Sequence, residues 1–493
     1  MAEVLWTIEQ LVAAARGRAE YAMPSGAEVR GVTGISIDTR SMKAGELFVA
    51  LKDQRDGHAF VADAFAAGAA AALVAEHYER KAGDGLLIRV DDVLVALERI
   101  GVAARARLGR QARVIAVTGS AGKTTTKEML RLALDVVAPG RVHASVKSFN
   151  NHWGVPLTLA RMPADTRFAV FEIGMNHAGE ITPLTRMVRP DVAIVTTVVA
   201  AHLEAFASVE DIARAKAEIF AGLEPGGIAV LNRDNPHYAL LRAAALARPG
   251  VDVVSFGSDT VPAGDGEGSL RLGAVEEHGA RTVAVARRGH EGGAAPSCRE
   301  IRFEIGASGR HMVLNALAVI AALEAAGVDV EQAISGLIAF GPPAGRGSRE
   351  DIPLIGGGSV LLIDESYNAN PASMQAALEA MAAVPRARHP RRVAVLGDML
   401  ELGARARELH VSVSSAITEA GIDRVFACGP NMRHLFDALP ARLQGVWAET
   451  SADLEEALRH DIAAGDAVMI KGSNGSRMAR LVTLVRTLGA RAA

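Results

Sequence analysis

The chain has 493 residues, and its 53 lysines and arginines nearly balance its 56 aspartates and glutamates, which gives a formal net charge of −3. This length exceeds what one hydrophobic core usually supports and predicts about three domains. Because basic residues are interspersed with acidic ones, the sequence offers no electrostatic basis for binding nucleic acid or a membrane surface.

Two further features of the sequence indicate the cellular compartment of the protein. No stretch reaches the roughly 18 consecutive apolar residues of a membrane span, and the N-terminus has the periodicity of an amphipathic helix rather than of a secretion signal. The only cysteines, Cys298 and Cys428, lie far apart without CxxC spacing, so we expect two buried thiols in a reducing compartment. We therefore expect a cytoplasmic protein with small-molecule partners, without nucleic acid and without membrane insertion. The sequence leaves the oligomeric state open, and we expect a monomer.

Residues 1–109 are typical of a small α/β unit. Asp38, Thr39 and Arg40 stand at the end of an expected strand, where they could hold a polar ligand. Taken alone, they are better explained as a strand-end turn, since Asp and Thr favour such positions for hydrogen bonds to the backbone. After the N-terminal helix, strand-like runs are expected at 34–38 and 47–51, a helix at 57–72, and short apolar runs at 72–74 and 86–90.

A phosphate-binding turn is predicted within 113–127, RVIAVTGSAGKTTTK. Residues 114–117 indicate a buried strand, and the residues after the turn carry apolar side chains at helical spacing. Backbone N–H groups of 119–124 would point into the turn, and the positive end of the helix would add to their attraction for phosphate. Lys123 can then reach the β- and γ-phosphates of a nucleotide, and the Thr124 hydroxyl can bind Mg²⁺.

This turn departs from the usual pattern GxxxxGK[ST]. Val117 stands where the first glycine is expected, and the glycine is instead Gly119. An ordinary glycine-rich turn with a solvated lysine is the alternative, but the strand, the GK pair, the three threonines and the helix together favour phosphate binding. The predicted nucleotide contacts of this turn are Gly119, Ser120, Ala121, Gly122, Lys123, Thr124 and Thr125.

Strand-then-helix units repeat through residues 110–344. This alternation predicts a mostly parallel sheet covered on both faces, with ligands at the carboxyl ends of its strands. Turn-rich, alternating stretches between 257 and 307 predict β-hairpins at the sheet edge, with flexible glycine-rich loops at 263–268 and 289–296. The expected strands are 168–173, 192–198, 228–232 and 252–256.

Four polar residues of this segment are candidates for a ligand site. Glu172 closes a buried strand, where a carboxylate suits the hard cation Mg²⁺, although a solvated strand end is the alternative. His202 and Lys216 follow the next strand; alone, they would be explained as a structural or surface histidine and an exposed helix lysine. Spacing does not show that these side chains converge. Asn315 lies within a long apolar helix, where its amide needs partners, and an adenine edge is one possibility.

Strands and helices alternate again in residues 345–493, and this pattern predicts a second, Rossmann-like doubly wound unit. A Pro- and Gly-containing stretch with Arg346 marks its start. No GxGxxG follows its first strand, which disfavours nicotinamide chemistry. Lys471 and Ser473, after the last strand, could bind an anion, with a generic turn as a comparable alternative. The strand runs are 360–363, 393–396, 425–427 and 467–470, and the first ends in Asp364, Tyr367, Asn368 and Asn370.

With these motifs assembled, the sequence resembles the Mur ligase family along essentially its whole length. TGSAGKTTTK looks like the family's phosphate loop, whose shortened GxxGK form accounts for Val117. DTRSMKAGELFVALKDQRDGHAF is similar to the uridine-binding N-terminal domain, and NNHWGVPLTL to the stretch near the substrate. FEIGMNHAGEI, AAHLEAF and ARAKAEIF resemble the segments with the metal-binding Glu, the metal-binding His and the carbamylated lysine. IDESYNANPAS, LGDMLELG and KGSNGSRM are similar to strings of the members that add D-alanyl-D-alanine.

The resemblance implies an ATP-dependent acid–amino-acid ligase of peptidoglycan precursor synthesis. It would join D-alanyl-D-alanine to UDP-N-acetylmuramoyl-tripeptide through an acyl phosphate. The domain at 1–109 would bind the UDP-sugar, the domain at 110–344 would bind ATP, and the domain at 345–493 would bind ATP and the incoming dipeptide. Lys123 would be catalytic together with two Mg²⁺ ions, one on Thr124 and Glu172 and the other on His202 and carbamylated Lys216. Further ATP contacts would be Asn315, Arg346, Asp364 and Asn368, and substrate contacts Ser36, Asp38, Thr39, Arg40, Asn150, Asn151, Lys471 and Ser473.

Some residues depart from the family pattern. Glu365 stands where Asp is common, His152 and Trp153 where an acidic–apolar pair is common, and a long glycine-rich insert precedes Cys298. The alternatives are a Mur-type ligase that adds a single amino acid to a UDP-muramyl peptide, a folate polyglutamate ligase, or a nucleotide-hydrolysing P-loop protein of another class. The uridine-type N-terminal segment argues against folate. The sequence leaves open whether the third residue of the tripeptide is meso-diaminopimelate or lysine.

Overall fold

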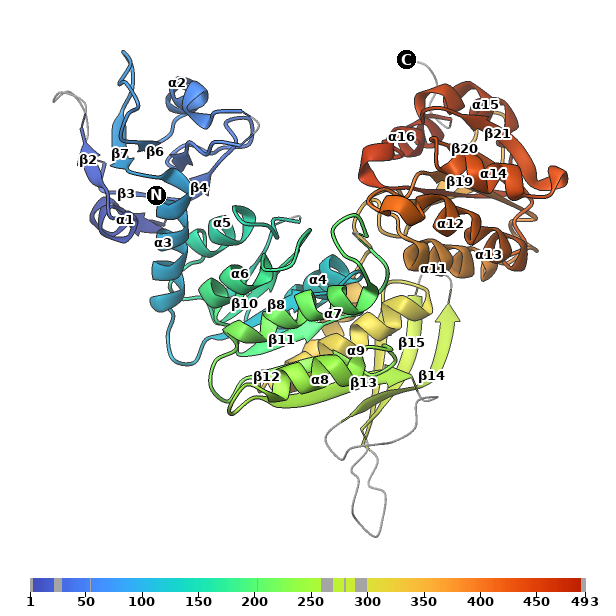
Figure 1. The fold of residues 1–493 in the computed structure, drawn as a ribbon, viewed down its shortest axis with the longest axis horizontal. Coiled ribbons are helices and arrows are strands. Elements are labelled where there is room, and N and C mark those ends of the chain that lie inside the picture. Colours follow the sequence, from blue (N-terminus) through green and yellow to red (C-terminus); the bar gives the residue numbers. More distant parts are fainter. Residues whose placement is uncertain are drawn as a thin grey trace, which may run out of the picture.

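The computed structural model describes residues 3–21, 29–53, 55–146, 148–201, 203–258, 269–278, 281–288 and 299–488. Three main sheets follow one another along the chain, each with its own helices, and the nine-stranded sheet lies between the other two (Figure 1). The α/β architecture with three domains is therefore confirmed. No helix among these residues is long and apolar enough to cross a membrane.

The N-terminal domain has a five-stranded sheet in the order β2-β7-β6-β5-β4 and a separate antiparallel pair, β1 and β3. The prediction of a helix over 57–72 is wrong in its second half. The helical stretch ends at Ala66, Gly68 turns the chain with φ 93°, and the next alanines enter the sheet as a buried strand. The elements are β1 (Trp6–Thr7), α1 (Ile8–Ala15), β2 (Arg18–Glu20), β3 (Gly31–Val32), β4 (Ile35–Ser36), β5 (Leu47–Val49), the 3-10 helix η1 (Gly57–Phe60), α2 (Val61–Ala66), β6 (Ala71–Ala75), β7 (Leu86–Val90) and α3 (Val93–Ala106).

The central domain has a nine-stranded sheet in the order β16-β15-β14-β13-β12-β11-β8-β10-β9. Its strands are parallel from β9 to β14, and β14, β15 and β16 pair antiparallel, as the hairpin prediction required. The glycine-rich pieces at 263–268 and 289–296, and Cys298, lie outside the described residues. The strands are β8 (Arg113–Thr118), β9 (Val142–Ala144), β10 (Phe168–Glu172), β11 (Val192–Val195), β12 (Ile228–Asn232), β13 (Asp252–Ser258), β14 (Leu270–His278), β15 (Arg281–Arg288) and β16 (Arg299–Ile305).

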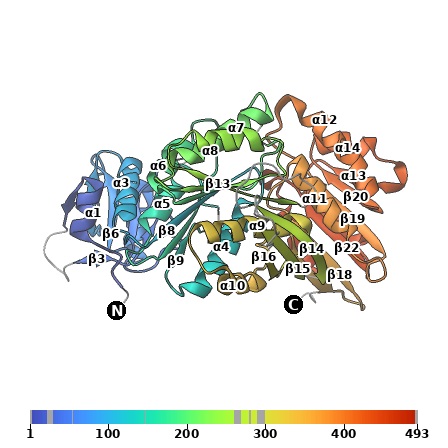
Figure 2. The same ribbon diagram turned by 90° about the horizontal axis from the view of Figure 1, so that it is seen from below.

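Different helices cover the two faces of this sheet (Figure 2). Alternate residues of β8 point to opposite sides: Val114 and Ala116 enter one apolar cluster, and Ile115 and Val117 enter the other. The cluster around Val114 continues without a break into the N-terminal domain. The helices are α4 (Lys123–Val137), α5 (Gly154–Ala160), α6 (Ile181–Val188), α7 (Val209–Ala217), η2 (Glu218–Gly222), α8 (Tyr238–Leu246), α9 (Arg310–Ala325), α10 (Val330–Ala333) and η3 (Ile334–Ala339).

The C-terminal domain has a six-stranded sheet in the order β17-β18-β22-β19-β20-β21, parallel except for β17. The sequence did not predict the edge strands β17 and β21. Cys428 is buried, as expected, and burial raises the pKa of its thiol to about 12. The elements are β17 (Ser348–Pro353), β18 (Ser359–Glu365), α11 (Pro371–Ala382), β19 (Arg391–Gly397), η4 (Gly403–Arg405), α12 (Ala406–Val411), α13 (Val413–Glu419), β20 (Arg424–Cys428), α14 (Met432–Ala438), η5 (Ala441–Leu443), β21 (Gln444–Ala448), η6 (Ala452–Leu454), α15 (Glu455–Asp461), β22 (Asp466–Lys471), η7 (Asn474–Ser476) and α16 (Ala479–Thr487).

Candidate active site

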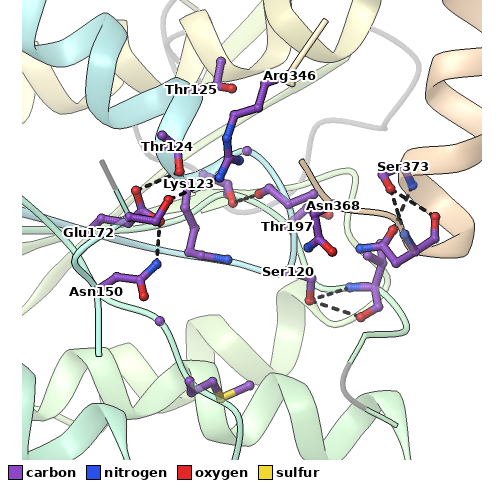
Figure 3. Close-up of a pocket in the computed structure, with 18 of the residues that line it drawn as sticks. Ser120, Lys123, Thr124, Thr125, Asn150, Glu172, Thr197, Arg346, Asn368 and Ser373 are labelled. Atoms are coloured by element: carbon purple, nitrogen blue, oxygen red, sulfur yellow. Dashed lines mark hydrogen bonds between the residues drawn. The ribbon is translucent and has the colours of Figure 1, made fainter. Parts of the chain in front are cut away.

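A cavity of about 1080 Å³ lies where the central and C-terminal domains meet. Its walls come from the turn between β8 and α4, the end of β10, the first turns of α9, the loop after β18 and the end of β22. Figure 3 shows part of this lining. The carboxyl ends of parallel strands from two sheets thus face one space, as expected for ligand binding in such folds. The predicted site residues that line it are Ser120, Ala121, Gly122, Lys123, Thr124, Thr125, Asn150, Asn151, Glu172, Asn315, Arg346, Asn368 and Lys471.

The phosphate turn depends on its two glycines. Gly119 and Gly122 have φ values of 151° and 82°, in the region that favours glycine. A Cβ atom at Gly119 would lie 1.9 Å from Thr196 Oγ1, and one at Gly122 would lie 2.5 Å from Asn315 Oδ1. The Thr196 hydroxyl also donates to the carbonyl of Ala121, which ties the turn to β11. The shortened GxxGK turn is therefore held tightly between β11 and α9.

Lys123 begins α4 and reaches back over the turn. Its Nζ donates to the carbonyl oxygen of Gly119 at 2.6 Å. Burial lowers the pKa of Lys123, the charge of Glu172 raises it, and the charge of Arg346 lowers it. Positive groups from both domains, Lys123 and Arg346, thus lie within electrostatic reach of each other beside the turn, an arrangement that suits a polyanionic ligand.

Glu172 is not a solvated strand end, since only 1% of its surface is exposed. Its Oε2 accepts the Thr124 hydroxyl at 2.8 Å, and its Oε1 accepts the Asn150 amide at 2.7 Å. The hydroxyl and carboxylate oxygens predicted to bind Mg²⁺ therefore lie side by side next to the phosphate turn. Asn151 accepts the backbone N–H of Gly154, and so fixes the start of α5.

Lys216 is not an exposed helix lysine. It is 2% exposed on α7, and no hydrogen bond or ion pair to its ammonium is present in the described part of the chain. Burial, followed by the positive charge of Lys123, lowers its pKa well below the usual value of 10.5. The two lysines therefore lie within electrostatic reach of each other. His202 lies outside the described residues.

The C-terminal wall contributes two groups of side chains. The Arg346 guanidinium stacks over the ring of Tyr367, with its carbon 4.0 Å from the ring centre. Both side chains also reach Ser148 of the central domain, the Tyr367 hydroxyl at 2.9 Å and Arg346 Nη2 at 3.4 Å. Buried Lys471 donates to the carbonyl of Asn368 at 3.1 Å and pairs with Glu365 at 3.3 Å.

Lys216 does not line the cavity, and three further predicted ligand residues support the cavity without lining it. Gly119 shapes the turn from behind. Asp364 is buried and accepts the backbone N–H of Gly345 at 3.0 Å and the Ser366 hydroxyl at 2.6 Å, so it fixes the connection between the two domains. Ser473 accepts the backbone N–H of Leu400 at 2.9 Å, which joins two strand-end loops.

Ser36 ends β4 in the N-terminal domain, Asp38, Thr39 and Arg40 follow it, and none of the four lines this cavity. The Asp38 carboxylate accepts the backbone N–H of Arg40 at 3.0 Å and its guanidinium at 2.9 and 2.7 Å, which is the strand-end turn that the residue types favoured. The Arg40 side chain remains 81% exposed.

Among the residues of the cavity wall that the sequence did not predict are Glu98, Ser148 and His311. His311 lies four residues before Asn315 on α9, so helical spacing alone was a usable signal for it. Ser148 meets partners 198 and 219 residues away, Arg346 and Tyr367, and no local pattern marks such a contact.

Comparisons with known proteins identify the family of this chain. Three family models match: "Mur ligase family, catalytic domain" over 31–129, "Mur ligase middle domain" over 117–323 and "Mur ligase, glutamate ligase domain" over 353–474. A relative from Bacillus subtilis (strain 168) is 34% identical, with 92% of each chain covered. One from Escherichia coli (strain K12) is 35% identical, with 80% of this chain and 81% of the relative covered. Both carry the name UDP-N-acetylmuramoyl-tripeptide–D-alanyl-D-alanine ligase.

Solved structures extend the likeness to three dimensions. A crystal structure of MurF from Acinetobacter baumannii is similar with a TM-score of 0.78 and 28% sequence identity, over 98% of each chain. The sequence motifs, the three-domain fold, the cavity and these relatives all agree, and the chain belongs to the Mur ligase family.

Proposed function

We propose that this protein joins D-alanyl-D-alanine to UDP-N-acetylmuramoyl-tripeptide at the expense of ATP, in the synthesis of peptidoglycan precursors. The observation that carries the proposal is the cavity, in which the phosphate turn, Glu172 and Lys123 of the central domain face Arg346 and Lys471 of the C-terminal domain. The two relatives named for this reaction match the chain over most of its length.

The first step is attack of the tripeptide carboxylate on the γ-phosphate of ATP, which gives an acyl phosphate and ADP. The protein's part in such a transfer is positioning and charge neutralisation. Backbone N–H groups of the turn and the ammonium of Lys123 hold the phosphates, and Arg346 neutralises them from the opposite wall. Asn315, which lies against Gly122, and Asn368 provide polar contacts for the rest of the nucleotide.

The residues present fit Mg²⁺, a cation that prefers oxygen ligands. The Thr124 hydroxyl and the Glu172 carboxylate lie 2.8 Å apart and are buried together, and they would hold one ion. His202 and a carbamylated Lys216 would hold a second. When bound, Mg²⁺ supplies positive charge that offsets the negative charge of the phosphoryl oxygens.

Carbamylation of Lys216 is supported by its surroundings. The ammonium first loses a proton, and the neutral amine then adds CO₂ and releases a second proton, so that an anionic oxygen donor replaces a cation. A lysine pKa lowered by burial keeps more of the amine neutral near neutral pH. A buried ammonium without a partner among the described residues is costly, and the modification removes that cost.

In the second step the free amine of D-alanyl-D-alanine attacks the acyl-phosphate carbonyl. A tetrahedral intermediate forms and collapses with release of inorganic phosphate. Lys471 and the loop after β18 lie on the C-terminal wall, where they would bind the incoming dipeptide. Closure of the two walls on the ligands completes the site.

We assign the UDP-sugar to residues 1–109, ATP to 110–344, and ATP with the dipeptide to 345–493. We further propose that the protein is a cytoplasmic monomer that does not bind nucleic acid.

Phosphate release tests this function. The purified protein, ATP, Mg²⁺ and UDP-N-acetylmuramoyl-tripeptide are combined with D-alanyl-D-alanine or with single amino acids, and the product is identified by its mass. Release of phosphate and a product heavier by one dipeptide residue, with D-alanyl-D-alanine alone, is expected. Release with a single amino acid and not with the dipeptide would overturn the choice of acceptor.

A further inference from the structure

Lys127 is a second lysine on α4, one turn after Lys123, and the reaction described above does not use it. It is 0% exposed, a rare placement for a lysine. Its Nζ donates to the carbonyl oxygen of Ser145 at 2.7 Å and pairs with Glu128 at 2.6 Å. A buried apolar side chain could pack against the sheet at lower desolvation cost, so this position indicates a use for the hydrogen-bond donor.

Ser145 connects Lys127 to the predicted metal ligand. It directly follows β9, and its backbone N–H continues the sheet by donating to Val170 of β10 at 3.1 Å. Its side-chain oxygen accepts the backbone N–H of Glu172 at 3.1 Å. Lys127 therefore holds the backbone carbonyl of Ser145, and the Ser145 hydroxyl in turn holds the backbone N–H of Glu172.

Asn150 supports Glu172 from the other side. Its side-chain amide donates to Glu172 Oε1 at 2.7 Å, and its backbone carbonyl accepts the backbone N–H of Gly174 at 2.8 Å. The carboxylate is thereby oriented with Oε2 toward the Thr124 hydroxyl. Ser145 and Asn150 together form what we call the Glu172 support.

We propose that Lys127 is a positioning residue of this enzyme, which acts through the Glu172 support to hold the Glu172 carboxylate beside Thr124. The inference rests on the proposed function only in taking Thr124 and Glu172 as ligands of the metal that accompanies ATP. Residues behind a metal ligand commonly change metal affinity or activity by about 10- to 100-fold when they are removed.

Two variants separate this role from simple packing. Lys127→Met keeps a long unbranched side chain and removes the donor, while Glu128 retains its contact with Arg131 at 2.8 Å. Ser145→Ala removes only the acceptor for the Glu172 N–H. Arg392→Met is the matched control: Arg392 is also a buried cation that donates to backbone carbonyls, those of Ala382, Val384 and Ala420, but it lies at the amino end of β19, away from the cavity.

The experiment measures Mn²⁺ binding to each full-length variant in the presence of a non-hydrolysable ATP analogue, together with the melting temperature and the Mg²⁺ dependence of ligation. Lys127→Met should weaken Mn²⁺ binding about 10-fold or more, and Ser145→Ala several-fold, while Arg392→Met should lower the melting temperature and leave Mn²⁺ binding unchanged. Wild-type Mn²⁺ affinity in Lys127→Met, with a melting temperature lowered as in the control, would show a purely structural lysine. If Lys127→Met does not fold, unchanged affinity in Ser145→Ala would by itself overturn the proposal.

Mn²⁺ binding needs neither the UDP-linked substrate nor the dipeptide. A wild-type protein that binds Mn²⁺ with the ATP analogue but does not join the dipeptide would remove the proposed function, and the Mn²⁺ measurements on Lys127→Met and Ser145→Ala would still decide the role of Lys127.

Discussion

The central domain meets its two neighbours in different ways. At the junction with the N-terminal domain, one apolar cluster runs from Trp6 through α3 and α5 into the central sheet. Trp6 Nε1 donates to the carbonyl of Ala160 at 2.8 Å, Arg107 stacks 3.7 Å above the Trp6 ring, and Arg161 Nε donates to the carbonyl of Ile35 at 2.6 Å. This junction resembles the interior of a single domain.

The junction with the C-terminal domain is polar. The two apolar clusters of that domain contain no buried residue of the central domain within the described ranges, and Leu203 is the central-domain side chain that packs against one of them. The contacts across the cavity are instead polar, as between Ser148 and the pair Arg346 and Tyr367. The difference separates two tasks: apolar burial fixes the first junction, whereas the second leaves its polar groups available for ligands. Each of the following changes tests that separation.

The largest effect is expected at the apolar junction. Trp6→Ala should reduce the free energy of unfolding by about 3–5 kcal/mol, because a large buried side chain is lost and a cavity is left. Affinity for an ATP analogue should stay at the wild-type value, since Trp6 is remote from the cavity walls. Denaturant unfolding and nucleotide titration measure the two quantities. A variant with normal stability and weakened nucleotide binding would reverse the roles of the two junctions.

Near the phosphate turn, where Lys216 lies within electrostatic reach of Lys123, Lys216→Ala should lower the ligation rate by about 10²- to 10³-fold, as expected when a group that stabilises developing charge is removed. Stability should not fall, because the ammonium has no partner among the described residues. Added short-chain carboxylates should restore part of the rate by replacing the carbamate. Arg214→Ala, an exposed neighbour on α7, is the control and should show neither effect. Full activity of unrescued Lys216→Ala would refute the assigned role.

Acid should weaken the attachment of α5, the central-domain helix that packs against α3 of the N-terminal domain. Nε2 of His143 lies 2.7 Å from the carbonyl of Thr158 on α5, and burial lowers the pKa of His143 to about 4. Between about pH 6.5 and 4 the unfolded chain binds a proton that the folded protein does not, so stability falls as the pH falls through this range. The expected loss at about pH 5 is of the order of 2 kcal/mol. Unfolding curves of His143→Gln should show a smaller loss; an equal loss would exclude His143 as the cause.

The smallest effect is expected from the contact across the cavity. Tyr367→Phe keeps the ring beneath Arg346 and removes the hydrogen bond to Ser148, which is worth about 1 kcal/mol. The KM for ATP should rise roughly threefold to tenfold without a change in melting temperature. Ser148→Ala should raise the KM for ATP by a similar factor. If the two side chains act together, the KM of the double variant should be no higher than that of either single variant. Additive losses would show two independent contacts.

Much of the fold follows from local patterns in the sequence. The buried strands β8, β10, β12 and β22 are continuous apolar runs followed by helices, which is why parallel sheets could be predicted. The edge strands β17 and β21, SREDIP and QGVWA, lack such runs because edge strands are only partly buried. The expected helix over 57–72 failed because alanine suits both helix and buried strand, and only Gly68 marked the change.

The site was predictable where its residues are neighbours in the chain. Gly119 to Thr125 form one motif, and Glu172 closes an adjacent strand of the sheet. The contacts of Ser148 with Arg346 and of Lys127 with Ser145 depend on tertiary packing and leave no local signal. Asp364 shows the converse: its position at a strand end suggested a ligand contact, but its carboxylate is taken up by Gly345 and Ser366.

A structure of the protein with Mg²⁺ and a non-hydrolysable ATP analogue tests most directly the claim that the polar junction is the site of chemistry. We expect the phosphates in the turn from Gly119 to Thr125, with contacts from Lys123 on one wall and Arg346 on the other, and Mg²⁺ on Thr124 and Glu172. A nucleotide bound with its phosphates outside this turn, or held without Arg346, would contradict it.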